Sequence, residues 1–184
     1  MARGLYGALI VEEPEPPEVD RDLPLLLDDW RLTGTAAIDE ESLGAMHDWA
    51  HAGRIGNWIT VNGDGAATMP ARRNERLRLR LCNTANARIF DLALKGLSGW
   101  LVALDGQPVP PGPMPERLSL APAQRADLIV DVTGEPGAEA ALAFVEREVA
   151  YAALVVTVEG EARAAPLPSP APLAPNPAPL PADL

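Results

Sequence analysis

The chain has 184 residues and a mass of 19.5 kDa, which suits one domain, or one domain with appendages. It is 47% hydrophobic and 22% charged, so it can form a packed core and is not a wholly disordered chain. Its 26 acidic and 15 basic residues give a net charge of −11, which argues against nucleic acid or anionic membranes as partners. The longest apolar stretches, 5–11 and 150–158, fall short of the ~18 residues of a membrane helix. We therefore expect no membrane insertion.

The first eleven residues carry one basic residue and a short apolar run, as the start of a signal peptide does. Acidic residues follow directly from Glu12 without a small-residue cleavage site, so the sequence predicts no export signal in this chain. We interpret 8–11 as a buried β-strand whose start is punctuated by Gly4 and Gly7. Prolines and acids over 12–22 separate this strand from the rest of the chain.

Short apolar or alternating segments recur between residues 23 and 158, at intervals of roughly 8–12 residues. Gly, Pro, Asn and Asp separate them, and this pattern is typical of an all-β sandwich or barrel. Asn62-Gly63 and Asp105-Gly106 predict tight turns. The expected strands are 23–30, 58–61, 76–81, 88–94, 100–104, 118–120, 126–132, 140–145 and 151–158.

Residues 39–51 break this pattern. Their apolar residues, among them Met46 and Trp49, recur at helical spacing. Asp39 can cap the start of a helix and Gly53 can end it. We predict one short helix or helical loop lying over the sandwich.

The two histidines of the chain, His47 and His51, would project from one face of that helix, at the spacing of zinc ligands. The helical zinc-protease motif requires a glutamate directly after its first histidine, but Asp48 stands there. No third His or Cys is nearby in the sequence. We expect two polar side chains that face solvent or cap a loop, and we assign no metal-ligating residue.

Arginine and leucine alternate strictly over 76–81, which predicts a half-solvated antiparallel strand. Like charges at Arg76, Arg78 and Arg80 repel one another unless acids lie opposite. We therefore expect carboxylates on a neighbouring strand or domain, and a solvated or interdomain face in preference to an anion-binding patch.

Cys82 is the only cysteine, which excludes an internal disulfide and a four-cysteine metal site. We assign it to the leucine face of this strand and expect a small buried hydrophobe, not a nucleophile. Asp28 and Asp29 are adjacent on an extended segment and do not form a glycosidase pair. The sequence contains no phosphate-binding glycine loop and no nucleophile elbow, so we assign no catalytic residue.

Six segments occur in the order and spacing of one family: 3–13 (RGLYGALIVEE), 19–30 (VDRDLPLLLDDW), 59–63 (ITVNG), 75–88 (ERLRLRLCNTANAR), 103–109 (ALDGQPV) and 120–128 (LAPAQRADL). Together they resemble the bacterial multicopper oxidases of the laccase type. The resemblance implies a Greek-key, cupredoxin-like β-sandwich from an enzyme with three such domains in a row. Residues 1–12 would be the last strand of a preceding cupredoxin domain, and 13–160 a copper-free middle domain. Residues 161–184, which hold eight prolines, would be a Pro/Ala-rich interdomain linker or C-terminal tail.

The family's copper ligands lie in His-x-His and His-Cys-His motifs of the outer domains, and this sequence contains neither motif. A blue-copper centre needs one Cys and two His, one of them shortly after the Cys. Here both histidines precede Cys82 by more than thirty residues. We therefore expect no catalytic, cofactor-binding or metal residue and no copper in this chain, with copper held elsewhere in the full-length parent.

By the same resemblance, the parent would be a periplasmic or exported enzyme that oxidises phenols or metal ions and reduces dioxygen to water. This chain would be its non-catalytic scaffold, and its partners would be the neighbouring cupredoxin domains or other copies of itself. Two alternatives stay open. One is a copper-free cupredoxin-fold structural or interaction protein of the bacterial cell envelope. The other is a truncated gene product that acts alone as a small acidic sandwich.

Overall fold

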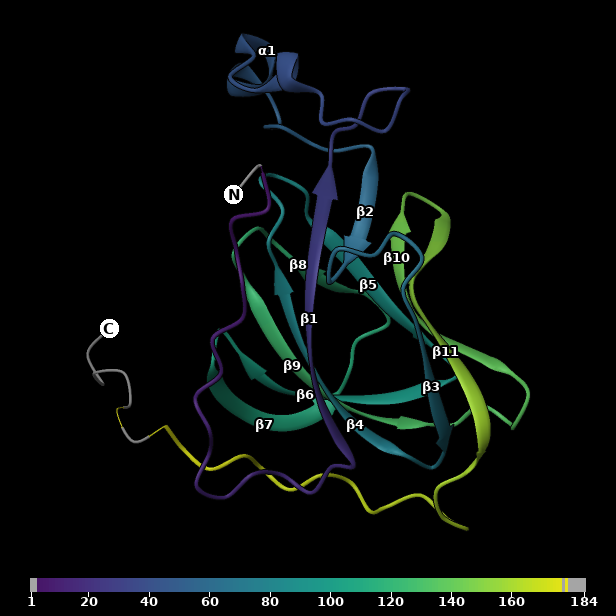
Figure 1. The fold of residues 1–184 in the computed structure, drawn as a ribbon. Helices are drawn as coiled ribbons and strands as arrows, with labels where there is room; N and C mark the ends of the chain where they lie inside the picture. The colour runs from purple at the N-terminus through teal and green to yellow at the C-terminus, as the bar shows by residue number, and fades with distance from the viewer. Residues whose placement is uncertain (1–2, 177, 179–184) are drawn as a thin grey trace.

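Two mixed β-sheets pack face to face in the computed structural model, which describes residues 3–176 and 178 (Figure 1). The first sheet has the strand order β2-β1-β4-β9-β6-β7, and the second has β3-β11-β10-β5-β8. Neighbours are antiparallel except for the parallel pairs β1/β4 and β3/β11. The strands are β1 Arg21–Trp30, β2 Trp58–Val61, β3 Thr68–Arg73, β4 Arg76–Asn83, β5 Phe90–Lys95, β6 Leu97–Leu104, β7 Gln107–Pro113, β8 Leu118–Leu120, β9 Arg125–Val132, β10 Glu139–Glu146 and β11 Val149–Glu161.

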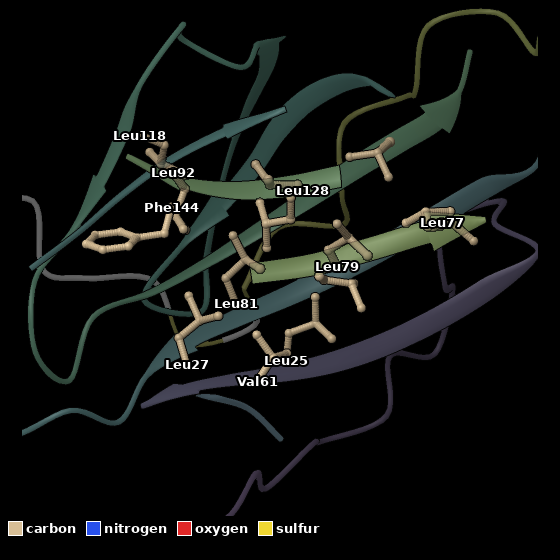
Figure 2. Close-up of a cluster of buried hydrophobic side chains, with 14 of the residues drawn as sticks. Leu25, Leu27, Val61, Leu77, Leu79, Leu81, Leu92, Leu118, Leu128 and Phe144 are labelled. Carbon is tan, nitrogen blue, oxygen red and sulfur yellow. The ribbon is translucent and has the colours of Figure 1, made fainter. Parts of the chain in front are cut away.

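The core lies between the sheets, where the leucine face of β4 is buried (Figure 2). Leu77, Leu79 and Leu81 are each at most 2% exposed. They pack with Leu25 and Leu27 of β1 in one cluster of buried apolar side chains. Burying a leucine side chain stabilises the fold by about 1.5–3 kcal/mol, so this row contributes strongly to holding the two sheets together.

The predicted β-sandwich is confirmed, and each strand predicted between residues 23 and 158 lies within or overlaps an observed one. The pattern missed β3 and β7. Proline cannot donate to a β-ladder, so Pro108 and Pro110 argue against a central strand. β7 tolerates them because it lies at an edge of the first sheet, as β3 does in the second.

Both predicted turns form. Asn62 and Gly63 have φ values of 52° and 84°, and Asp105 and Gly106 have 49° and 81°. Two consecutive residues with positive φ are the signature of the tight hairpin turn, in which Gly at the second position avoids a steric clash.

The predicted helix is shorter than expected and placed differently. Residues 39–51 contain a 3-10 turn, Glu40–Ser42, and the helix α1, Met46–Ala50, which stands at one end of the sandwich beyond β1 (Figure 1). Met46 and Trp49 are 75% and 78% exposed, so the predicted apolar face is not buried. A helix of five residues is instead anchored by a polar contact, because the buried Asp48 accepts hydrogen bonds from Arg31 at 2.8 and 3.2 Å.

The prediction of a buried strand at 8–11 is wrong. Residues 3–20 form no strand, and Leu9 and Val11 are 93% and 79% exposed. The segment crosses the outer face of the first sheet, where Glu13 forms an ion pair with Arg78 of β4. We call residues 3–20 the entry segment.

Residues 162–176 contain neither helix nor strand, and we call them the exit segment. The rest of the predicted linker, residue 177 and 179–184, lies outside the described residues. Over the described residues, no helix has the length and apolar character needed to span a bilayer.

Candidate functional site

The outer face of the first sheet carries an arginine row, which we define as Arg76, Arg78 and Arg80 of β4. Each member bonds to a carboxylate on a neighbouring strand: Arg76 to Asp131, Arg78 to Asp127, and Arg80 to Asp22. The expectation of acidic partners is thus confirmed. The expectation of a half-solvated face is wrong, because Arg76 and Arg78 are only 3% and 1% exposed.

Strand register explains these pairs. Arg76 lies directly opposite Asp131 on β9, and its Nε and Nη2 donate to the two carboxylate oxygens at 2.7 and 2.8 Å. A two-bond contact of this kind is strong and geometrically specific. The same guanidinium lies 5.4 Å from the ring centroid of Trp100 on β6. Removing only one partner of such a buried pair would leave an uncompensated charge.

Arg78 is covered by the entry segment. Its Nη1 and Nη2 donate to the Glu13 carboxylate at 2.7 and 2.9 Å, while its Nε and Nη2 donate to Asp127 at 3.0 and 2.6 Å. The hydrogen bonds from Arg78 hold the pKa of Glu13 below its usual value. Two carboxylates therefore satisfy one buried guanidinium, and one of them comes from outside the sheet.

The exit segment covers the Arg76 end of the arginine row. Arg163 donates to both carboxylate oxygens of Asp20, at 2.7 and 2.9 Å. The Asn74 amide donates to the Arg163 carbonyl oxygen at 2.8 Å, and Arg76 donates to the Leu167 carbonyl oxygen at 3.3 Å. The entry and exit segments thus run over the same region of the molecule and are joined by an ion pair (Figure 1).

Cys82 lies on this outer face and not among the core leucines. Side chains alternate along a strand, so residue 82 shares the face of the even-numbered arginines, and its assignment to the leucine face is wrong. The side chain is half-buried. Burial raises the pKa of its thiol, although the positive charge of Arg125 acts in the opposite direction. Such a thiol is a poor nucleophile at neutral pH.

A second polar cluster surrounds Asp29, whose side chain is fully buried near the end of β1. Arg88 donates to Asp29 Oδ2 at 2.9 Å and to the Gly56 carbonyl oxygen at 2.8 Å. Asp29 Oδ1 has no hydrogen-bond partner among the described residues. Arg88 was not singled out from the sequence alone. Its signal was its charge, because a buried acid such as Asp29 needs a basic partner.

The neighbouring Asp28 points to the opposite face of β1. Desolvation raises its pKa, while the interaction with Tyr6 of the entry segment acts in the opposite direction. Desolvation and this contact raise the pKa of Tyr6 to about 12. The adjacent aspartates therefore have separate structural partners and do not face each other across a cleft.

The residues present do not fit a blue-copper or trinuclear centre. His47 and His51 lie next to each other on the surface, with ring centroids 4.4 Å apart. Cys82 belongs to the arginine face of β4. Within 3–176 and 178, no three His, Cys, Asp or Glu side chains are grouped so that they could hold a metal ion. The copper content of the chain itself stays a prediction.

The two sheets form a β-sandwich, and similarity to a solved multicopper oxidase shows that this sandwich is cupredoxin-like. Comparison with known proteins gives its family. A model of the multicopper oxidase family matches residues 21–148, and the chain belongs to this family. The crystal structure of a multicopper oxidase from Pseudomonas thermotolerans superimposes with a TM-score of 0.84 at 33% identity, covering 96% of this chain and 41% of that one.

Two kinds of curated relatives match. The cell division protein FtsP of Sodalis glossinidius is 32% identical over 139 residues, and a laccase of Bacillus subtilis is 28% identical over 152 residues. These matches cover 71% and 76% of this chain but only 28% and 29% of the relatives. The chain thus spans less than a third of the length of the curated relatives it matches.

Proposed function

We propose that this chain is the copper-free middle domain of a multicopper oxidase, and that it holds the two outer copper domains in the orientation they need. The observation that carries the proposal is the ligand shortage: one cysteine and two neighbouring histidines in a domain of this family. A blue-copper centre requires one Cys and two His around one metal, and the trinuclear centre requires several more histidines. The full-length parent would oxidise phenols or metal ions and reduce dioxygen to water.

The architecture supports a scaffold role. The described chain enters and leaves the sandwich over one region, where the Asp20–Arg163 pair joins the entry and exit segments. The buried arginine row beneath them is fully ion-paired, which gives both segments a fixed surface to lie on. The partners in this proposal are the neighbouring cupredoxin domains, or other copies of this chain, and the parent would be periplasmic or exported.

A second candidate is a copper-free structural or interaction protein of the bacterial cell envelope. The similarity to the cell division protein FtsP favours it, because that relative is at least as similar in sequence as the laccase. The ligand shortage is compatible with both candidates.

The experiment that tests the proposal is to express the chain together with the segments that its gene encodes on either side. The scaffold account expects His-x-His and His-Cys-His motifs in those segments, several coppers per chain, and oxidation of a phenol with consumption of dioxygen. A longer protein without those motifs, or one that binds no copper, would overturn the account and favour the cell-envelope alternative.

A further inference from the structure

The outer face of the first sheet holds more carboxylates than guanidinium groups around Arg78. Within hydrogen-bond or ion-pair distance, Arg78 and Arg80 face Glu13, Asp22 and Asp127. Asp22 and Asp127 belong to strands β1 and β9, which are fixed in the sheet. Glu13 alone comes from the entry segment, which forms no strand.

We propose that the arginine row of β4 is a docking surface for an acidic, proline-rich extended peptide, that its occupant is the chain's own entry segment, and that Glu13 is the releasable anchor. The positive charge of the arginine row matches the acidic composition of the entry segment. Residues 12–20 contain five carboxylates and three prolines among nine residues. Prolines keep such a segment extended, so it can lie across a sheet without competing for the backbone hydrogen bonds of the strands.

Charge balance explains why Glu13 can leave while the sheet stays intact. When Glu13 is removed, Asp22 and Asp127 still face Arg78 and Arg80, two charges against two. Arg78 keeps its two hydrogen bonds to Asp127 and is not left as an unpaired buried charge. The Glu13 side chain is also 29% exposed, so water can solvate it on release.

The second anchor limits how far the segment can move. Asp20 is held by Arg163 and also accepts a hydrogen bond from the Arg76 backbone N–H at 2.7 Å. Release of Glu13 therefore frees the chain between Tyr6, which lies against Asp28, and Asp20, while the chain next to β1 stays in place. The consequence for the orientation of a flanking domain depends on the proposed function, but the docking itself does not.

The test compares Glu13→Gln with Glu15→Gln in the full chain. Glu15 lies in the same segment, is exposed, and forms no salt bridge with any described residue, so the two variants share the charge change and differ in the contact. Backbone ¹⁵N relaxation of Glu12 reports mobility on the ps–ns timescale. We expect an order parameter near 0.8 in the wild type and in Glu15→Gln, and a fall below about 0.6 in Glu13→Gln.

Urea unfolding of the same variants separates release from unfolding. The Glu13→Gln midpoint should lie only slightly below that of the wild type, because the sheet keeps its own ion pairs and only the contact with Glu13 is lost. Unchanged order at Glu12 in Glu13→Gln, equal loosening in both variants, or a loss of cooperative folding would overturn the proposal. Order at Glu12 that rises with protein concentration would place the segment on a second copy of the chain and would also overturn it. None of these readouts depends on copper, so this proposal can fail while the scaffold role stands, and the reverse.

Discussion

The buried pair Arg76–Asp131 allows a quantitative test of what holds the outer face together. Both side chains are at most 4% exposed, and they share two hydrogen bonds of 2.7 and 2.8 Å. Asp131→Leu would leave the guanidinium buried with only the Leu167 carbonyl oxygen and the Trp100 ring as partners. Breaking one side of a buried pair costs about 3–5 kcal/mol.

Arg76→Met should cost a similar amount, because it leaves the Asp131 carboxylate buried without its partner. The two single changes would then sum to about 6–10 kcal/mol. The double variant removes both charges and should cost no more than about 2 kcal/mol, since apolar replacement of a whole buried pair is often nearly neutral.

Urea unfolding of the wild type, the two single variants and the double variant measures these free energies. In thermal unfolding, each single variant should melt about 6–20 °C below the wild type. Glu135→Gln is the matched control. It breaks the Arg73–Glu135 pair, in which Glu135 is 67% exposed, and should change stability by less than about 1 kcal/mol. Single variants that lose less than 1 kcal/mol, or a double variant that loses the full sum, would refute this reasoning.

Three further outcomes follow from other side chains. Arg88→Leu should lower the free energy of unfolding by about 3–5 kcal/mol in urea denaturation, because it leaves the buried Asp29 carboxylate without its cation; a loss below 1 kcal/mol would contradict this. Cys82 should react with iodoacetamide at pH 7.5 at least ~10-fold more slowly in the folded chain than in urea, since burial raises the pKa of its thiol; equal rates would count against it. Tyr6 should ionise near pH 12 when followed by absorbance, and Tyr6→Phe should remove that phase. Because folding raises this pKa from 10.0, the stabilisation is present below pH 10 and is lost as the pH rises towards 12; a single phase near pH 10 would contradict this.

The sequence predicted the sandwich well because its signals are local. Strict alternation over 76–81 marks a strand, and consecutive positive-φ residues such as Asn62-Gly63 mark a turn. The need of the arginine row for acidic partners also followed from like-charge repulsion on one strand face. These inferences require only neighbours along the chain or across one ladder.

Burial of the arginine row was not predictable in the same way. Its cover comes from Glu13, 65 positions before Arg78, and from the exit segment, whose Leu167 lies 91 positions after Arg76. No periodicity links such distant segments. The same holds for the entry segment: its apolar residues resemble a strand locally, but the ion pair from Glu13 places it across a sheet face.

The exposure of α1 has a related cause. Helical spacing of Met46 and Trp49 usually indicates a buried face, but a helix of five residues can be positioned by a single polar contact such as Arg31–Asp48. Cys82 was assigned to the wrong face although the alternation itself determines that face, so its placement was predictable from the sequence.

The measurement that tests the central claim most directly is copper loading of the isolated chain. The purified protein is incubated with Cu(I) without oxygen, exposed to air, and passed through a chelator before metal analysis and visible spectroscopy. A domain without a copper ligand set should retain far less than one copper per chain and show no blue thiolate–copper absorption. One tightly held copper per chain with a blue spectrum that Cys82→Ser abolishes would contradict the account.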